Sequence, residues 1–483
     1  MIKPLNTKLW IEPNIKGPIS QYSNYNHYYH LSEHLYIIIN GLTGAVDAVS
    51  DVIYSKIINV EISALRIQHF TEFNYLISRG YIIDSKESEN EIKNELVNSL
   101  IESAKLLDNT FMICPTDFCS MGCKYCFTHK FTKESEKITL SNEQITAIFL
   151  KMNDISDGNP NSQKLVVLYG GEPFQPYTLD TIEFILYSAK KNGFQVAGFS
   201  NGYYLDLFIP LLTKYQEVIK ILSVTIDPPS LHNQKRAMKD SFETAVKNID
   251  ILQNIKNFHI QLKSNVDINN IGLIPEIIQF YKQKNWWLNP NITYELNPIR
   301  YGNLEIKDCS LYDAELSIKV IQLLKENDEI NRFDILPIID YKYYYYEAFG
   351  IYSILDEKKI EAVKVPKAYH CPSVSGHVFI FDANGNVFLC NEEIGNKDQI
   401  FGSYINNNYI LQKNKFDAYT NRKIGNLEIC DDCKFSFVCG GGCACYSKVT
   451  DNVKCPTIKT DISSIIAVFK NDIINHLTKI ENV

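Results

Sequence analysis

The stretch from Cys114 to Phe127 reads CPTDFCSMGCKYCF and places Cys119, Cys123 and Cys126 in a CxxxCxxC pattern, directly after an apolar segment. Three thiolates at this spacing can wrap a loop around one corner of a four-iron cubane and ligate three of its irons. The fourth iron then keeps an open position for a small molecule. Zinc is the alternative, but structural zinc sites are closed by four nitrogen or sulfur ligands. A single triplet after a predicted strand favours an iron–sulfur cluster.

Apolar and amphipathic segments alternate on the C-terminal side of this loop. Amphipathic stretches at 141–153 and 241–255 predict helices between apolar strands. Repeated β-α units predict an α/β fold with a parallel sheet, either an open sheet or a partial barrel, and ligands in such folds gather at the carboxyl ends of the strands. The six predicted strands cover 110–114, 164–169, 195–200, 220–226, 259–266 and 291–296.

Further motifs follow the next three predicted strands. Glycines after the second strand allow the backbone to approach a ligand closely, and a carboxylate beside them can accept a hydrogen bond from an ammonium group. The third strand ends in a short polar segment, and the fourth is followed by a histidine and an arginine. These residues are Gly170, Gly171, Glu172 and Pro173, then Ser200 and Asn201, then Thr225 with His232 and Arg236.

Together these motifs resemble the radical S-adenosylmethionine (SAM) superfamily, which implies a partial (β/α)6 barrel. In that family the open iron binds the amino and carboxylate groups of SAM, and an electron from the cluster cleaves SAM to a hydrogen-abstracting 5′-deoxyadenosyl radical. The resemblance implies that the three cysteines are catalytic, that Tyr125 packs on the adenine, and that Thr225 and Arg236 contact the ribose and the carboxylate. Threonine stands where the family usually has serine. The other implied SAM-binding residues are Gly170, Gly171, Glu172, Pro173, Ser200 and Asn201.

A second group of cysteines lies near the C-terminus, in the order C, GxxxxC, CxxCxxxxxCxxxC and C. Its CxxC and CxxxC pairs alone would suit zinc equally well. The seven positions in order resemble the SPASM domain, which implies two auxiliary [4Fe–4S] clusters and a total of three. The resemblance assigns Cys430, Cys433, Cys439 and Cys455 to an outer cluster, and Cys371, Cys390 and Cys443 to an inner one.

The fourth ligand of the inner cluster is left open. Either Cys445 supplies it, or an open iron binds a substrate thiolate. Cys114 is predicted to be a core residue, because free cysteine packs as a small hydrophobe. Cys309 has no assigned role.

Composition limits the class of protein. The net charge of −8 argues against nucleic acid as a main partner. The N-terminus lacks the apolar segment of a signal peptide, and the sequence contains no run of 18 apolar residues. We therefore expect a cytoplasmic protein without a membrane partner. In that compartment an odd number of cysteines, 13, most of them grouped by short spacers, indicates metal or cluster ligands rather than disulfides.

The sequence divides into four predicted parts. Residues 1–105 combine a strand at 34–40, a helix from Ser50 or Asp51, a helical stretch at 64–80 and a strand at 81–84, which suggests a winged-helix-like module. Residues 106–335 form the predicted barrel, 336–369 a bridging region and 370–483 the SPASM domain. The aromatic run 340–349 favours a packed helix over a surface on which substrate stacks.

Enzymes with SPASM domains mostly modify peptides and proteins. Sulfatase-maturing enzymes use an aspartate as base directly after the second SPASM cysteine, where this chain has Asn391. The N-terminal module instead resembles the element that binds the leader of a ribosomally made precursor peptide as an added strand. We expect a peptide maturase that installs an oxidative cross-link. A thioether is the first choice, followed by C–C or C–O cross-links and epimerisation, and sulfatase-type maturation is the other alternative. The implied partners are the precursor peptide and an electron donor such as flavodoxin or ferredoxin.

Overall fold

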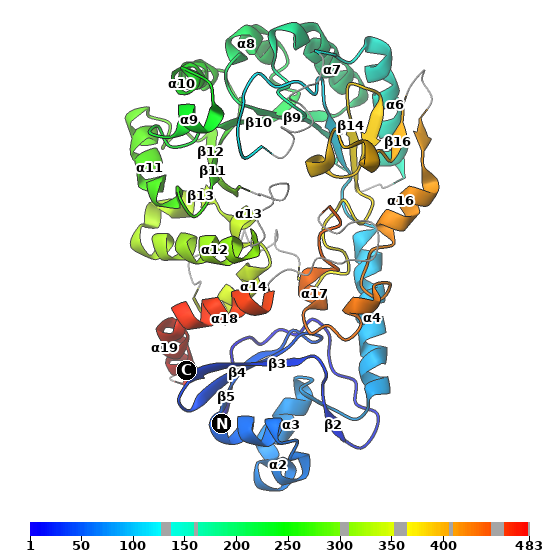
Figure 1. Ribbon diagram of the computed structural model, residues 1–483, viewed down its shortest axis with the longest axis vertical. Helices are drawn as coiled ribbons and strands as arrows, with labels where there is room; N and C mark the ends of the chain where they lie inside the picture. The colour runs from blue at the N-terminus through cyan, green and yellow to red at the C-terminus, as the bar shows by residue number, and fades with distance from the viewer. Residues whose placement is uncertain are drawn as a thin grey trace. The chain divides into compact units, whose positions relative to one another are not determined.

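The computed structural model describes residues 1–126, 137–158, 163–299, 309–351, 365–404, 409–445 and 458–481. The chain forms two compact units, coloured by residue number in Figure 1. The first contains residues 1–105, 339–371 and 421–483, and the second contains 106–338 and 372–420. None of the helices in the described ranges combines the length and the apolar character needed to cross a membrane.

The second unit is built on a mostly parallel sheet. Six of its strands run parallel to their neighbours in the order in which they occur in the sequence. The six predicted strands are therefore confirmed, with ends that differ by at most two residues from the prediction. The observed strands are β7 (Thr110–Ile113), β8 (Leu165–Leu168), β9 (Gln195–Ser200), β10 (Ile219–Thr225), β11 (Ile260–Val266) and β12 (Ile292–Pro298).

Helices connect these strands, and neighbouring helices pack on one another. Two of them have recognisable end signals: Ser141 closes a capping box at the start of α6, and Gly193 ends α7 in the left-handed region at φ 74°. The helices are α6 (Asn142–Asp157), α7 (Leu179–Asn192), α8 (Leu205–Lys214), α9 (His232–Arg236), α10 (Ser241–Leu252), α11 (Ile274–Gln283) and α12 (Cys309–Glu326).

Side chains alternate between the two faces of this sheet. In β11 the side chains of Ile260, Leu262 and Ser264 are buried. Those of Gln261, Lys263 and Asn265, which point to the other face, are half-buried. One face therefore forms an apolar core and the other carries polar groups. The carboxyl ends of the strands meet at one edge, which is where the predicted motifs lie.

The sheet continues past β7 into a part of the chain that the sequence analysis placed elsewhere. Strand β14 (Val378–Phe381) pairs in parallel with β7, with Phe381 opposite Ile113. Residues 372–420 therefore belong to the same compact unit as the six strands, while the four-part division of the chain stays a prediction. The remaining elements are β13 (Phe333–Asp334), β15 (Asn386–Phe388), β16 (Gly402–Ser403), β17 (Ile410–Leu411) and α16 (Lys413–Thr420).

The first unit contains a four-stranded antiparallel sheet in the order β1-β5-β4-β3, with β3 and β1 at its edges. The prediction missed β1, β2, β3 and β5. The helical stretch predicted at 64–80 is two helices, because His69 leaves the helical region at φ −141°. The elements are β1 (Ile2–Pro4), β2 (Gln21–Tyr22), β3 (Asn26–Ser32), β4 (Leu35–Asn40), β5 (Val46–Ser50), α1 (Asp51–Ile58), α2 (Ile62–Gln68), α3 (Phe70–Ser78), β6 (Ile82–Ile83) and α4 (Lys86–Ala104).

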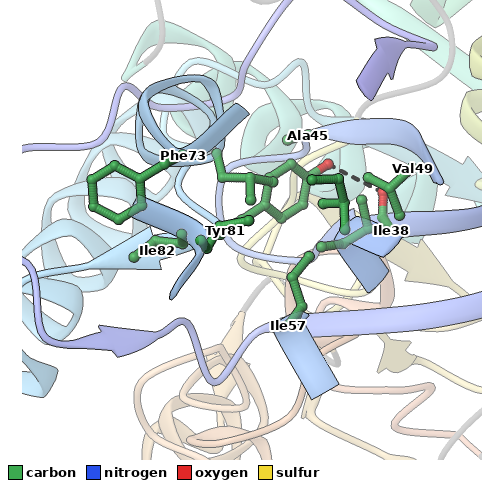
Figure 2. Close-up of a cluster of buried hydrophobic side chains, with 10 residues drawn as sticks. Ile38, Ala45, Val49, Ile57, Phe73, Tyr81 and Ile82 are labelled. Atoms are coloured by element: carbon green, nitrogen blue, oxygen red, sulfur yellow. Dashed lines mark hydrogen bonds between the residues drawn. The ribbon is translucent and has the colours of Figure 1, made fainter. Parts of the chain in front are cut away.

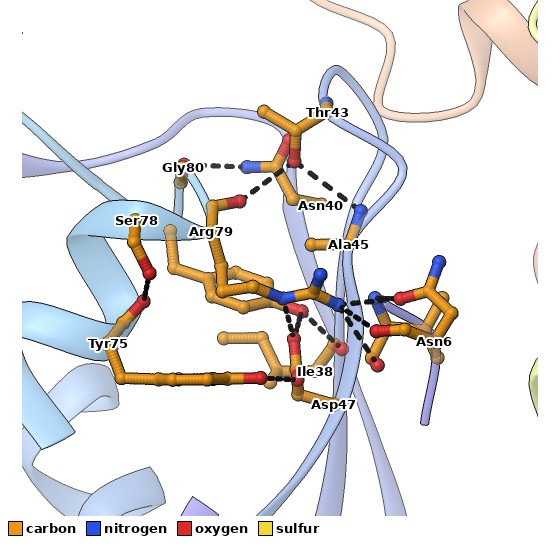
Figure 3. A network of polar contacts seen from close by, with 12 residues as sticks. Asn6, Ile38, Asn40, Thr43, Ala45, Asp47, Tyr75, Ser78, Arg79 and Gly80 are labelled. Carbon is orange, nitrogen blue, oxygen red and sulfur yellow. Dashed lines mark hydrogen bonds and ion pairs between the residues drawn. The ribbon is translucent and has the colours of Figure 1, made fainter. Parts of the chain in front are cut away.

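Figure 2 shows the hydrophobic core of this module, in which Tyr81 lies among aliphatic side chains such as Ile38 and Val49. The Tyr81 hydroxyl donates to the Ile38 carbonyl (3.1 Å) and to Asp47 (2.6 Å). Figure 3 shows that Asp47 also accepts from Tyr75 and forms an ion pair with Arg79, whose Nε lies 2.9 Å from Oδ2. The buried carboxylate is therefore fully partnered.

A second core joins α4 to the C-terminal part of the same unit. Tyr25, Ile92 and Leu96 pack with Cys430 and Phe437. The run of tyrosines near 340–349 forms α14 (Lys342–Ala348) with Tyr345 and Tyr346 buried, which confirms the prediction of a packed helix. The remaining helices are α13 (Leu336–Ile339), α17 (Ser436–Cys439), α18 (Ile458–Val468) and α19 (Lys470–Glu481).

Candidate functional site

The three-cysteine loop leaves the carboxyl end of β7. Cys123 is buried, and Cys119 and Cys126 are half-buried, with the Cys126 amide donating to the Cys123 carbonyl (3.1 Å). Burial, together with the nearby Glu172 carboxylate and the other two thiols, raises the pKa of Cys119 to about 12. Burial also raises the pKa of Cys123. Such thiols ionise when a metal binds them, so cluster loading is coupled to proton release.

The two glycines of the second motif pack directly against this loop. Gly170 has φ +110°, and a Cβ atom on Gly171 would lie 2.4 Å from the Phe118 carbonyl oxygen. The Glu172 amide donates to the same carbonyl (3.0 Å). The predicted reason for these glycines is a close approach of the backbone to SAM. The structure supplies a further reason, which is that only residues without a Cβ fit against the cysteine loop.

Glu172 is the buried acceptor at the centre of the second and third motifs. Its Oε1 accepts from the Ser200 hydroxyl (2.9 Å) and its Oε2 from the Asn201 amide (2.7 Å). Burial raises the pKa of Glu172 to about 7, although these hydrogen bonds oppose the shift. Pro173 contributes its carbonyl, which accepts from Thr178 (2.6 Å). The structure therefore brings together Glu172, Ser200 and Asn201.

Arg236 connects the fourth motif to the cysteine loop. Its Nη1 lies 3.7 Å from the Cys123 Sγ, and its Nη2 lies 3.0 Å from the Asp227 Oδ2. The Arg236 carbonyl also accepts from the Gly122 amide (3.2 Å). Arg236 is buried.

Tyr125 lies in the same network. Its ring is 5.7 Å from the Arg236 guanidinium carbon and 5.3 Å from the Lys235 Nζ, and its hydroxyl accepts from Asn265 (3.3 Å). Asp227, Lys235 and Asn265 also belong to this network, although they were not predicted as site residues. Asp227 had a visible signal, because it is a carboxylate directly after a predicted parallel strand.

Thr225 ends β10 opposite Lys263 of β11. Across the described residues it has no hydrogen bond to the Glu172 and Arg236 network, so its predicted contact with the ribose stays a prediction. Beside it, the Lys263 Nζ lies 3.5 Å from Glu295 and 4.9 Å from the centre of the Phe199 ring. These groups give the polar face of the sheet a charged pair next to an aromatic surface.

Asn391 follows Cys390 in the second unit and donates to the Tyr169 hydroxyl (3.3 Å). Tyr169 comes directly before Gly170, and burial raises its pKa. An amide and a phenol of raised pKa are both poor proton acceptors at neutral pH. The pair therefore provides no base at the position where sulfatase-maturing enzymes have aspartate.

The auxiliary cysteines are divided between the units. Cys371, Cys430, Cys433, Cys439 and Cys443 belong to the first and Cys390 to the second, and Cys455 lies outside the described residues. Cys445 is described, but the side chain of Cys309 is not. Within the first unit the segment before Cys371 runs beside α17, because His370 contacts the Cys439 carbonyl (2.9 Å). Among the described residues no three histidine, cysteine, aspartate or glutamate side chains are arranged to hold a single metal ion. Cys114 is fully buried, as predicted.

The residues around the cysteine loop fit a cluster with bound SAM. The Nδ2 of Asn201 and the Nε of Arg236 are buried and have no partner. Together with the acidic Glu172, they offer donors and an acceptor to a ligand that carries both an ammonium and a carboxylate. The cysteine loop itself supplies three thiols for iron.

Comparison with known proteins agrees with this chemistry. Residues 113–264 match the family model described as the radical SAM superfamily, a stretch that contains the cysteine loop, Glu172 and Arg236. A search of curated protein sequences gives no significant match.

Three solved structures are similar to this chain at low sequence identity. SuiB of Streptococcus suis bound to the precursor peptide SuiA is 13% identical, with 88% of this chain and 95% of SuiB covered at a TM-score of 0.45. SuiB bound to S-adenosylmethionine is 12% identical, with 88% and 95% covered at a TM-score of 0.45. Archaeal TYW1 is 19% identical, with 44% of this chain and 70% of TYW1 covered at a TM-score of 0.29. At these values the assignment rests on the family match and on the site.

The superfamily's cofactors are SAM and a [4Fe–4S] cluster, for which the loop and the Glu172 network supply fitting groups. This chain therefore carries a radical SAM domain over residues 113–264 and is a radical SAM enzyme.

Proposed function

We propose that this enzyme modifies a ribosomally made precursor peptide and that Cys119, Cys123 and Cys126 hold its SAM-binding [4Fe–4S] cluster. The observation that supports the radical chemistry is the set of buried contacts that join the cysteine loop to Glu172 and to Arg236. When bound, the cluster and SAM supply one-electron chemistry that generates a hydrogen-abstracting radical.

The residues of the chain then have defined tasks. Glu172 is oriented by Ser200 and Asn201 and accepts a hydrogen bond from the ammonium group of SAM. Gly170 and Gly171 keep the second motif against the cysteine loop. The free Nδ2 of Asn201 and the Nε of Arg236 are available to the carboxylate of SAM. Tyr125, held at its hydroxyl by Asn265, offers a ring face to the adenine.

The C-terminal cysteines support the proposal of a SPASM domain with two auxiliary [4Fe–4S] clusters. Cys430, Cys433, Cys439 and Cys455 would hold the outer one, and Cys371, Cys390 and Cys443 the inner one, completed by Cys445 or left open. The spacing of the seven cysteines supports this assignment. Burial raises the pKa of the Cys439 thiol to about 11, and the nearby Cys433 thiol contributes to this shift, which is consistent with the assignment.

The proposed substrate is a precursor peptide whose leader binds the N-terminal module. The module has an edge strand, β3, beside half-buried aromatic rings such as Tyr36 and Tyr54, which stack 3.7 Å apart. An extended peptide can add to such an edge through backbone hydrogen bonds. The proposal includes a winged-helix-like fold for this module.

The proposed product is an oxidative cross-link, with a thioether as the first choice. An auxiliary cluster with an open iron would bind a peptide thiolate and position it for bond formation. The Asn391 and Tyr169 pair, which provides no base, disfavours sulfatase-type maturation. Cross-links through carbon or oxygen and epimerisation are the next alternatives. The electron donor is proposed to be a flavodoxin or a ferredoxin.

Reconstitution tests the cofactor assignment. Anaerobically reconstituted enzyme should contain about twelve irons with matching sulfide, from three four-iron clusters. Replacing Cys119, Cys123 and Cys126 by alanine should remove about four irons and abolish the reductive cleavage of SAM. Continued formation of 5′-deoxyadenosine by that variant would show that the radical cluster lies elsewhere.

Peptide recognition is best tested without truncation. Deleting residues 1–105 would remove Tyr25, Ile92 and Leu96 from the core that surrounds Cys430, and would disturb the auxiliary cysteines directly. Hydrogen exchange of the intact enzyme avoids this problem. A precursor peptide encoded by a neighbouring gene should protect amides of β3, and the same peptide without its leader should not. Peptide binding without protection in residues 1–105 would refute the recognition role.

A further inference from the structure

Arg236 bridges a predicted cluster ligand and a buried carboxylate. One terminal nitrogen, Nη1, is 3.7 Å from the Cys123 Sγ and the other, Nη2, is 3.0 Å from the Asp227 Oδ2. The guanidinium is planar and rigid, so fixing one nitrogen also fixes the direction of the other. The side chain of Arg236 is 7% exposed and that of Asp227 is fully buried, which leaves little room for other arrangements.

Asp227 is itself held from several sides. Its Oδ1 accepts from the Asn265 amide (3.0 Å) and lies 3.9 Å from the Lys235 Nζ, and its own amide donates to the His232 Nδ1 (3.2 Å). These contacts come from β11 and α9 as well as from the strand end that carries Asp227. The carboxylate is therefore a fixed anchor for the arginine.

A hydrogen bond to a cluster sulfur and a nearby positive charge both stabilise the reduced, more negative cluster, so they raise its reduction potential. We propose that Asp227 is a positioning residue, which raises the reduction potential of the SAM-binding cluster by holding the Arg236 guanidinium against Cys123. The inference rests on the proposed role of Cys123 as a cluster ligand. It adds a redox role to Arg236, whose predicted role was contact with SAM.

Two effects of Asp227 oppose each other, and this opposition makes the inference testable. Its negative charge alone lowers the cluster potential, whereas its anchoring of Arg236 raises it. Arg236 acts on Cys123 more strongly than Asp227 does, because it contacts the sulfur directly. Loss of the anchor should therefore outweigh loss of the negative charge.

The experiment is a redox titration of the reconstituted full-length enzyme without SAM, followed by electron paramagnetic resonance. The titrant supplies one electron, which converts the oxidised cluster to the reduced cluster. The relevant signal is the one that changes when SAM is added afterwards and that disappears in the variant without Cys119, Cys123 and Cys126. If that signal persists without the three cysteines, the proposed cluster assignment fails. That outcome is separate from the outcomes for Asp227.

The enzyme variants Arg236→Met and Asp227→Asn should both lower the potential. We expect the ratio of reduced to oxidised cluster at a fixed potential to fall by about tenfold in Arg236→Met, which is about 59 mV for a one-electron couple. In a chain that already carries Arg236→Met, the further change Asp227→Asn should raise the potential, because only the loss of negative charge remains. A rise in the single Asp227→Asn variant, or an unchanged potential in Arg236→Met, would overturn the inference.

Two further variants complete the test. Asp250 lies on α10 in the same unit and pairs with Lys284 (2.6 Å). Asp250→Asn removes this carboxylate and should leave the reduction potential of the SAM-binding cluster unchanged. Arg236→Lys keeps the charge but replaces the fork by a single ammonium, which cannot reach both partners at once. It should lower the potential even if Asp227→Asn fails to retain its cluster, and an unchanged potential in Arg236→Lys would then decide against the inference.

Discussion

The backbone of Gly171 lies so close to Phe118 that a Cβ atom would sit 2.4 Å from the Phe118 carbonyl oxygen. The second motif thus fixes the path of the cysteine loop by contact between two backbones. The cysteine loop therefore depends on glycine at position 171.

Gly171→Ala should displace the cysteine loop and lower the rate of SAM cleavage by about 100-fold, the cost that a displacement of about 1 Å can have in an active site. Iron content and 5′-deoxyadenosine formation measure the effect. Gly272→Ala is the matched control, because a Cβ atom there meets nothing within 4 Å. Equal activity of the two variants would show that the loop does not depend on this contact.

SAM affinity should depend on the protonation of Glu172. Burial raises the pKa of its carboxyl to about 7 in the empty site. The group is neutral below that pH and charged above it, and an ammonium ligand favours the charged form. Affinity should therefore rise as the pH increases through about 7, and binding near that pH should release protons. Calorimetry in buffers of different ionisation enthalpy measures this release, which should be absent in Glu172→Gln. The same release in that variant would assign the proton to another group.

The buried pair of Asp47 and Arg79 should be important for the stability of the N-terminal module (Figure 3). Arg79→Met leaves the fully buried Asp47 carboxylate without its cation, a change that costs about 3–5 kcal/mol in comparable pairs. Hydrogen exchange of β4 and β5 reports the loss. Lys190→Met breaks an exposed pair with Glu217 and should cost about 0–1 kcal/mol. A similar small cost for Arg79→Met would mean that the module relaxes around Asp47.

Lys93 should support the auxiliary cysteines from α4. Its Nζ donates to the Asp431 carbonyl (2.9 Å) and to the Asp431 carboxylate (3.0 Å), between Cys430 and Cys433. Lys93→Met removes hydrogen bonds from a charged donor, worth about 1.5–3 kcal/mol each. We expect iron to fall by about one four-iron cluster while the SAM-responsive signal remains. Lys105→Met is the control, because it breaks only an exposed ion pair with Glu102 at the C-terminal end of α4. The enzyme with this substitution should keep all its iron.

The sequence by itself determined the local features of this protein. The cysteine spacing and the GGEP segment identified the radical SAM chemistry, and alternating apolar segments located β7 to β12 to within two residues. These signals are readable because strand periodicity and motif spacing depend on residues that are close together in the chain.

Only the tertiary structure decided which distant segments meet. Strand β14 pairs with β7 across more than 260 intervening residues, and Cys430 shares a core with α4. Asp227 and Arg236 are close in sequence, but Cys123, which Arg236 contacts, lies more than 100 residues earlier in the chain. Such contacts depend on register and on the burial of charge, because a buried carboxylate needs partners wherever the fold can supply them. The cysteine loop was visible in the sequence, whereas the residues that hold it in place became visible only in the folded chain.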